Sequence, residues 1–197
     1  MEIYLIRHTT PLTEKGQIYG RTDVALAESF AEEKDLIIEQ LPAKCDAVFS
    51  SPSSRCTQLA KAIAVNYNLG TNTFRRFSDQ AEVASCYTDE ALYELNFGDW
   101  EGKTWDTVNR KDSEIWMNDF VHLAPPNGET MLEMEQRVIQ FMERLIQQSY
   151  QTVCVVTHGG VIRILLARYS GIPLKDSFSI KVGMGEVFKL ALSSSAP

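Results

Sequence analysis

The chain has 197 residues, of which 44% are hydrophobic and 23% are charged, proportions typical of one globular domain with a buried core. It carries 19 basic and 26 acidic residues, a formal net charge of −7, which argues against a partner such as nucleic acid or an anionic membrane. No apolar stretch approaches the roughly 20 residues of a membrane span, and the four cysteines lack metal-ligand spacing, so we expect a cytoplasmic protein with reduced thiols and no bound metal.

Short β-rich runs alternate with helical patterns in the first part of the chain. The runs 2–7 and 46–50 predict two strands. Apolar residues at helical spacing over 30–41 predict a helix that ends before Pro42. A further apolar repeat of period 3.6 predicts a second helix over 52–67.

The middle of the chain, 71–128, is predicted to be irregular. It is too long for a plain connection, so we expect a lid or a binding loop there. After it, Thr130 and Glu133 have the spacing of a capping box that begins a long helix. The nearly continuous apolar run 152–157 predicts a third strand that is buried on both faces, and 161–169 predicts the next helix.

Two late strands are predicted over 178–182 and 186–192. Strands that alternate with helices predict an α/β fold, a three-layer α/β/α sandwich with a mostly parallel sheet. We expect a single domain over 1–197, with the lid or insertion inside it. The late strands could also form an edge contact in a homodimer.

Arginine and histidine side chains follow all three predicted inner strands. Arg7 and His8 end the first strand, Arg55 lies just beyond the second, and His158 follows the third. Because chemistry in open α/β sheets takes place at the carboxyl ends of the strands, we expect these side chains to converge. Unpaired cations side by side repel each other, and an anion between them removes the conflict.

Phosphate is the anion that suits these residues. Arginine offers a planar fork that matches phosphate oxygens. Gly159 lies at the start of a predicted helix, whose free N–H groups and positive dipole end also favour an anion. A neutral histidine among such groups can attack phosphorus as a nucleophile, and a carboxylic acid could protonate the leaving alkoxide.

Four segments, taken in chain order, resemble the signature segments of the histidine phosphatase superfamily, which is also called phosphoglycerate mutase-like. They are residues 5–9, the tail of the second strand with Arg55, residues 94–102 and residues 156–161. One such motif alone is weak, but four in this order span almost the whole chain. The resemblance implies a phosphoglycerate mutase-like fold and a phosphohistidine intermediate.

The resemblance also implies a role for each matching residue. His8 matches the phosphorylated nucleophile, and Glu94 matches the general acid that later activates water. Arg7, Arg55 and His158 match the residues that clamp the phosphate. The other positions implied to bind the phosphate or the leaving group are Gly159, Gln17, Tyr19 and Gly20. For the last three, an ordinary turn is the alternative interpretation.

Two departures from the family pattern affect the choice of activity. Thr9 stands where the first motif usually has glycine, and Thr10 stands where the mutases have a glutamate, which counts against mutase activity. The chain most resembles the α-ribazole phosphatase branch, through residues 7–11, 19–24, 94–100 and 126–130. This resemblance implies hydrolysis of a small-molecule phosphate ester, α-ribazole 5′-phosphate or the corresponding adenosylcobalamin 5′-phosphate, without a metal or other cofactor.

Several alternatives stay open at this point. A broad-specificity phosphatase, a mutase-type enzyme and a non-catalytic module that binds a phosphorylated ligand are the competing functions. The acids that compete with Glu94 are Asp89, Glu90, Asp99 and Glu101. Trp100, Trp105 and Trp116 either pack in a small core or include one that stacks on a flat ring of the substrate. We expect no catalytic role for His122.

Overall fold

A mixed six-stranded sheet forms the centre of the molecule in the computed structural model, which describes residues 1–69, 74–77 and 85–192. The strands lie in the order β3-β4-β2-β5-β1-β6. Their bounds are Glu2–Arg7 (β1), Ala47–Ser50 (β2), Arg75–Arg76 (β3), Cys86–Thr88 (β4), Thr152–Thr157 (β5) and Val187–Ala191 (β6). All neighbouring strands are parallel except β6, which runs antiparallel to β1 at the edge of the sheet.

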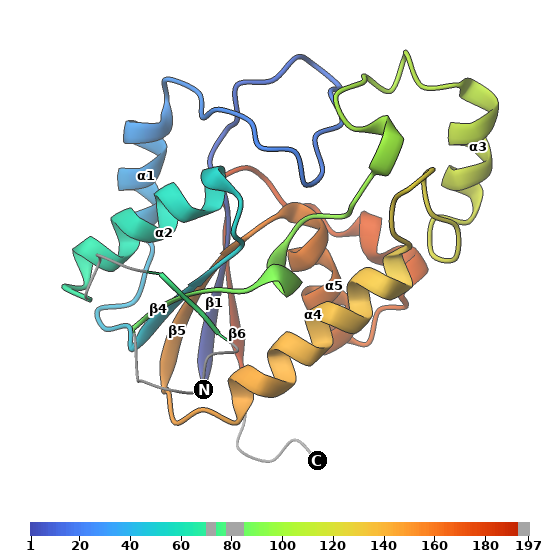
Figure 1. Cartoon of the computed structure of the whole chain (residues 1–197). Coiled ribbons are helices and arrows are strands. Elements are labelled where there is room, and N and C mark those ends of the chain that lie inside the picture. Colours follow the sequence, from blue (N-terminus) through green and yellow to red (C-terminus); the bar gives the residue numbers. More distant parts are fainter. Residues whose placement is uncertain (70–73, 78–84, 193–197) are drawn as a thin grey trace.

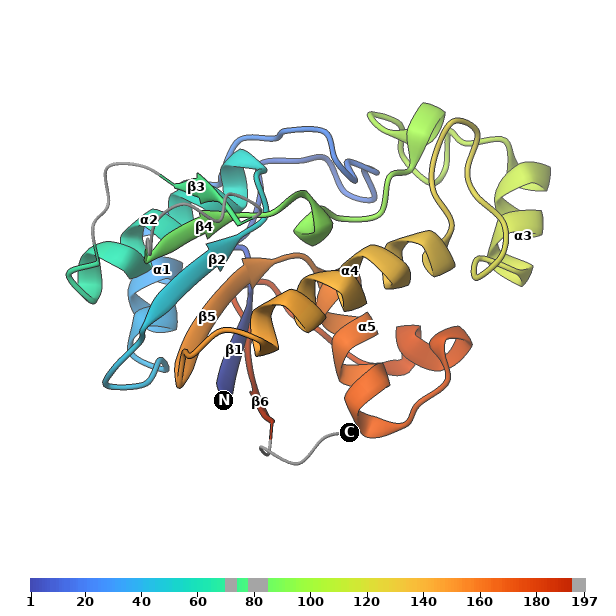
Figure 2. The same cartoon turned by 60° about the horizontal axis from the view of Figure 1, so that its bottom comes forward.

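Helices cover both faces of this sheet (Figure 1, Figure 2). The α-helices are Phe30–Ile38 (α1), Ser54–Asn66 (α2), Arg110–Asn118 (α3), Met131–Ile146 (α4) and Gly159–Ser170 (α5). Short 3₁₀ helices cover Glu90–Leu92 (η1), Gly98–Trp100 (η2) and Leu174–Ser179 (η3). Helices α1 and α2 lie on one face and α4 and α5 on the other, so the predicted three-layer α/β/α fold is confirmed.

The side chains of the inner strands divide between the two layers because successive residues of a strand point to opposite faces. In β1, Ile3 and Leu5 pack with α4 and α5, whereas Ile6 packs with α1 and α2. In β5, Val153 and Val155 join the first core, and Cys154 joins the second. Both faces of these strands are therefore buried, as the continuous apolar run in β5 predicts.

The predicted late strand over 178–182 is wrong. Residues up to Ser179 belong to η3, and the carbonyls of Ile180 and Val182 accept hydrogen bonds from arginine side chains of α5 and β1 rather than from a strand. Phe178 packs edge-to-face on Phe120, 4.6 Å between ring centroids, instead of on the sheet. The second late strand is present as β6.

The predicted irregular middle over 71–128 is also wrong in part, because it contains β3, β4 and α3. Strands β3 and β4 have two and three residues, too few to produce a recognisable alternation in the sequence. They extend the parallel sheet beyond β2. Residues 71–73 and 78–84 of that range lie outside the described residues.

Candidate active site

The carboxyl ends of β1 and β5 bring two histidines together. In the parallel pairing of these strands Arg7 lies opposite Thr157, so the next residues, His8 and His158, leave the sheet side by side. Their ring centroids are 5.2 Å apart. Figure 1 shows long loops of the chain gathered over this end of the sheet, and both histidines are buried there.

His8 is almost fully buried and is held as a neutral ring. Its Nδ1 lies 2.7 Å from the carbonyl oxygen of Thr9, which can only accept, so Nδ1 carries the proton and Nε2 keeps its lone pair. Burial lowers the pKa of His8 to about 3. The hydrogen bond to Thr9 alone would raise this pKa, whereas the positive charges of Arg55 and Arg7 lower it further. A neutral imidazole with a free Nε2 is the form that can act as a nucleophile.

His158 is fully buried beside it, and neighbouring side chains fix its ring. Nδ1 accepts from Nη2 of Arg55 at 3.3 Å, and Nε2 donates to Oγ of Ser51 at 2.9 Å. The hydroxyl of Ser53 lies 3.3 Å from the same Nε2. Burial, followed by the charges near it, holds the pKa of His158 well below its usual range, so this ring is neutral as well.

Two guanidinium groups face the histidines without a carboxylate partner. Arg55 is fully buried and donates from Nη2 to the carbonyl of Gly20 at 2.7 Å and from Nη1 to that of Thr22 at 2.9 Å. Arg7 donates from Nη1 to the carbonyl of Val182 at 2.6 Å. In the described part of the chain, neither forms an ion pair, and the buried Nε of each has no hydrogen-bond partner.

A buried cation such as Arg55 is costly unless an anion neutralises it. The penalty for an uncompensated buried ion is several kcal/mol. A phosphate dianion would match the two positive charges, and its oxygens could accept from the unpartnered N–H groups. The arrangement therefore fits the phosphate site expected at this sheet edge.

Glu94 lies at the other side of the site, against the start of α5. Its Oε2 accepts from the backbone N–H of Gly160 at 3.1 Å, and its Oε1 accepts from that of Leu95 at 3.0 Å. A Cβ at position 160 would lie 2.2 Å from Oε1 of Glu94, so only glycine leaves room for this approach. The carboxyl group is thus held at the N-terminal turn of the helix that follows His158.

The four competing acids have other partners. Asp89 accepts from the N–H of Ala91 at the start of η1 and pairs with Arg144, and Glu90 pairs with Arg76. Asp99 accepts from Asn127, and Glu101 accepts from backbone N–H groups at Arg21, Thr22 and Phe97. These contacts favour Glu94 among the five as the acid of the site.

The loop before α1 contributes two of its three predicted residues. The ring of Tyr19 lies edge-on to His8, 6.4 Å between centroids, and under the guanidinium of Arg55 at 5.0 Å. Gly20 holds Arg55 through its carbonyl, and a Cβ there would come within 2.6 Å of the carbonyl of Leu95. Gln17 instead accepts from the N–H of Glu14 within its own turn, so its hydrogen bond does not connect it to the histidines.

Gly159 lies under two guanidinium groups, those of Arg7 and of Arg163, and Arg163 is not among the predicted site residues. A Cβ at this position would lie 3.3 Å from Cζ of Arg7 and 3.0 Å from Nη1 of Arg163. Arg163 is tethered through Nε to the carbonyl of Ile180 at 3.0 Å. Burial and the nearby Arg7 charge lower its pKa. The i,i+4 spacing from Gly159 places Arg163 on the same helix face and could have indicated it.

The other missed residues orient the predicted ones. Ser51 and Ser53 fix the ring of His158. Both lie in the same strand tail as Arg55, and this position is the sequence signal that could indicate them. Arg137 of α4 contacts the segment that carries Glu94, and no local sequence signal links the two.

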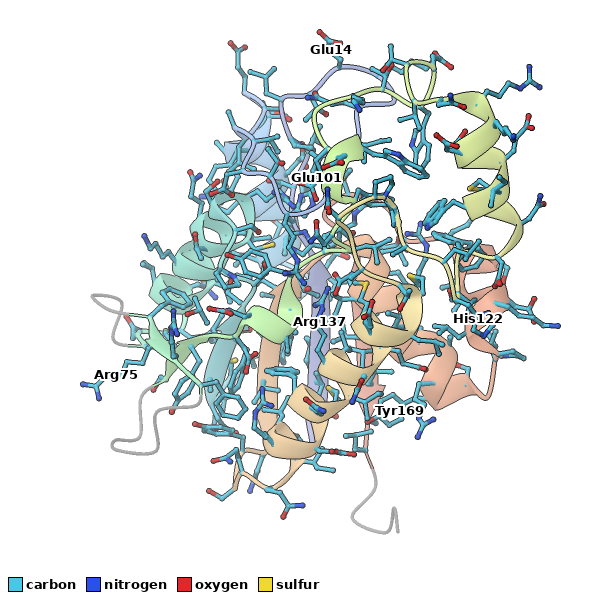
Figure 3. The ribbon with its side chains drawn as sticks, turned by 45° about the vertical axis from the view of Figure 1, so that its right-hand side comes forward. Glu14, Arg75, Glu101, His122, Arg137 and Tyr169 are labelled. Atoms are coloured by element: carbon cyan, nitrogen blue, oxygen red, sulfur yellow. The ribbon has the colours of Figure 1, made fainter. Side chains whose placement is uncertain are left out.

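The three tryptophans form one aromatic cluster. Trp105 stacks on Trp116 at 5.9 Å between centroids, and Trp100 meets Trp116 edge-to-face at 5.7 Å. Trp100 and Trp116 are buried, while Trp105 is 40% exposed. This packing supports the interpretation of a small core. Figure 3 shows His122 at the outside of the molecule, where its Nδ1 lies 2.6 Å from Asp119.

Within the described ranges, no three histidine, cysteine or acidic side chains are grouped so that they could hold a metal ion. No helix in the same ranges is long and apolar enough to cross a bilayer.

Comparisons with known proteins agree with this geometry. The chain is 30% identical over 183 residues to a Hydrogenobacter thermophilus protein named as a candidate phosphoserine phosphatase, covering 90% of this chain and 83% of that protein. It is 39% identical over 98 residues to the adenosylcobalamin/alpha-ribazole phosphatase of Escherichia coli, 48% of each chain. The crystal structure of the alpha-ribazole phosphatase from Shigella flexneri superimposes with a TM-score of 0.81 at 26% identity, covering 98% of this chain and 92% of that one.

The family comparison covers nearly the whole chain. Residues 3–197 match the histidine phosphatase superfamily (branch 1), a range that includes every residue of the site described above. With His8, His158 and the two arginines converging at one sheet edge, sequence, fold and family comparison agree, and the chain belongs to the histidine phosphatase superfamily.

Proposed function

We propose that this protein is a phosphomonoesterase that works through a phosphohistidine on His8, and that its substrate is α-ribazole 5′-phosphate or the corresponding adenosylcobalamin 5′-phosphate. The observation that carries the proposed mechanism is the neutral, buried His8, which has a free Nε2 and lies within reach of the charges of Arg7 and Arg55. Neither arginine forms an ion pair with any residue that the structure describes.

In the first step, Nε2 of His8 attacks phosphorus and the ester P–O bond breaks. The proton of the Glu94 carboxyl group moves to the leaving oxygen, so the alcohol departs neutral. Arg7 and Arg55 stabilise the charge that develops on the three phosphoryl oxygens. The products of this step are the free alcohol, the phosphohistidine and the Glu94 carboxylate.

In the second step, water replaces the histidine. The Glu94 carboxylate accepts a proton from a water molecule as the water oxygen attacks phosphorus, and the P–N bond breaks. Inorganic phosphate leaves, while His8 is again neutral and Glu94 is again protonated. The hydrogen bonds from Leu95 and Gly160 to the Glu94 carboxyl group support this position for the proton carrier.

The choice of substrate is supported by the names of similar proteins and by the motifs that resemble the α-ribazole phosphatase branch. Phosphoserine is the second candidate, because one relative covering nearly the whole chain is named for it. The two candidate substrates are distinguished by kcat/KM, measured for α-ribazole 5′-phosphate, for phosphoserine and for a simple alkyl phosphate as reference. An α-ribazole 5′-phosphate value no higher than the others would rule out the proposed substrate.

Rapid quench with a ³²P-labelled phosphomonoester tests the mechanism. We expect an acid-labile, base-stable phosphoprotein in the wild type and none in His8→Ala, whose turnover should fall by about 10³-fold or more. Circular dichroism would establish that the variant is folded. Normal turnover in folded His8→Ala would contradict the proposed mechanism.

A further inference from the structure

Arg137, on α4, uses all five N–H donors of its guanidinium group on the surroundings of Glu94. Nη1 donates to the carbonyls of Ala91 at 2.6 Å and Tyr93 at 2.7 Å. Nη2 donates to the carbonyl of Glu94 at 3.1 Å and to Oε1 of Glu129 at 2.7 Å. Nε donates to Oε2 of Glu129 at 3.1 Å. A guanidinium group has five N–H donors, so none is left over.

Glu129, two residues before the start of α4, is the carboxylate partner of Arg137. Besides the two bonds from Arg137, its Oε1 accepts from the backbone N–H of Asn96 at 2.8 Å and from Arg21 at 3.1 Å. Burial alone would raise the pKa of Glu129, but the hydrogen bonds and charge of Arg137 outweigh it and hold that pKa below its usual value. Glu129 is therefore ionised and forms a bidentate, partly buried ion pair with Arg137.

The backbone around Glu94 depends on these side chains for its hydrogen bonds. The carbonyls of Ala91, Tyr93 and Glu94 are held by Arg137, and that of Leu92 accepts from the Thr157 hydroxyl at 2.8 Å. Four successive carbonyls are thus satisfied by side chains of α4 and β5 rather than by a strand or a long helix. Figure 3 shows Arg137 between α4 and the segment that follows β4.

The same saturation shows that Arg137 is not a further phosphate ligand. Its side chain is 18% exposed, and every donor already has an oxygen acceptor. Binding a phosphate would require breaking one of these bonds. Any effect of Arg137 on the reaction must therefore pass through the segment it holds.

We propose that Arg137, together with Glu129, is a positioning residue that fixes the Glu94 carboxyl group for transfer of its proton to the leaving oxygen. The inference rests on the proposed function of Glu94. Rigid α4 anchors the backbone carbonyl of Glu94, and its side chain then reaches the N–H of Gly160 at 3.1 Å. Misplacement of a catalytic group by about 1 Å can cost on the order of 100-fold in rate.

The test compares two leaving groups in Arg137→Lys. An alkoxide leaving group needs the proton of the acid, whereas dinitrophenolate leaves without one. Lysine keeps the charge, but one ammonium group cannot span three carbonyls and a carboxylate. We expect the pre-steady-state rate of phosphoenzyme formation to fall by about 10- to 100-fold with an alkyl phosphate and by less than about 3-fold with 2,4-dinitrophenyl phosphate.

Arg144→Lys is the matched control. Arg144 lies two turns further along α4 and pairs with Asp89 at the start of η1, at 2.6 Å, without touching Glu94. We expect both phosphoenzyme rates to stay within about 2-fold of wild type in this variant. Glu129→Gln, which removes the charge of the second member of the pair, should reproduce the leaving-group dependence of Arg137→Lys.

A double-mutant cycle of Arg137→Lys with Glu94→Gln distinguishes positioning of Glu94 from a general structural role of Arg137. If Arg137 acts through Glu94, adding Arg137→Lys to Glu94→Gln should lower the alkyl phosphate rate by less than about 3-fold. Equal losses for both leaving groups, or full losses in the double variant, would mean a structural role and overturn the proposal, as would no loss at all. Failure of the proposed function looks different, since wild type would then form no phosphohistidine.

Discussion

At the scale of single residues, the site depends on glycines that let charged side chains approach a helix start. Gly159 lies under the guanidinium groups of Arg7 and Arg163, and Gly160 meets the Glu94 carboxyl group. Arg7 and Glu94 thus face the same turn of α5, from the end of β1 and from the segment after η1. With the Glu94 carboxyl group in this place, even a methyl side chain at position 160 does not fit.

Gly160→Ala tests this close approach. The added Cβ would lie 2.2 Å from Oε1 of Glu94, so the carboxyl group must move and lose its bond to the N–H of residue 160. We expect kcat for an alkyl phosphate to fall by about 100-fold. Stopped-flow and steady-state kinetics measure the loss, and inorganic phosphate inhibition shows whether the phosphate site survives. An unchanged kcat would contradict the role given to this contact.

At the scale of elements, the start of α4 is well specified by its sequence. Thr130 accepts from the N–H of Glu133, and the Glu133 side chain accepts from the N–H of Thr130, so the predicted capping box is confirmed. Glu129 directly precedes this cap, and Arg137 lies two turns inside the helix. The cap therefore fixes where α4 begins, and Arg137 of the same helix holds the Glu94 segment.

Thr130→Ala should lower the free energy of unfolding by about 1 kcal/mol, because an N–H at the helix start loses its acceptor. Urea denaturation followed by circular dichroism measures the change. Thr57→Ala is the control, since the Thr57 hydroxyl donates to the Ser54 carbonyl at the start of α2 and caps no N–H group. If both variants lost equal stability, the capping interpretation would be wrong.

The sequence predicts the elements that carry their own periodicity and misses those defined by distant contacts. Strands β1, β2 and β5 are apolar runs, and residues at their ends could be assigned to a common edge by topology alone. Strands β3 and β4 are too short for such a signal. The run 178–182 has strand composition, but Arg163 and Arg7 take the carbonyls of Ile180 and Val182.

The same distinction applies to the site. His8 and His158 could be paired because both follow parallel strands. Arg137 could not be linked to Glu94, since the contact joins residues 43 positions apart and depends on how α4 packs against η1. Ser51 is an intermediate case, because it lies in a predicted strand tail, but its bond to His158 depends on the pairing of β2 with β5.

At the scale of the whole molecule, the net charge and the charge of the site have opposite signs. The chain carries a formal charge of −7, yet Arg55 is fully buried and the Nε of Arg7 is enclosed at the site. A negative outer surface does not attract phosphate esters over long distances, so selection among them depends on close contacts in the site. Burial also holds both site histidines neutral, and this couples the site to the stability of the fold.

That coupling predicts that the protein loses stability as the pH falls. In the unfolded chain His8 and His158 take up protons near their ordinary pKa of about 6.5. In the folded protein burial lowers the pKa of His8 to about 3 and that of His158 well below its usual range. Below pH 6.5 the unfolded state therefore binds more protons, and the free energy of unfolding should decrease by about 2 kcal/mol per histidine between pH 7.5 and pH 5.

Urea denaturation in phosphate-free buffer at several pH values measures this decrease, since bound phosphate would stabilise the folded state. His8→Gln removes one of the two titrating groups while keeping a polar side chain of similar length. We expect its loss of stability between pH 7.5 and pH 5 to be about half that of the wild type. A variant that lost as much stability as the wild type over this range would mean that the fold does not hold His8 neutral, and the proposed nucleophile would need another source of its neutral form.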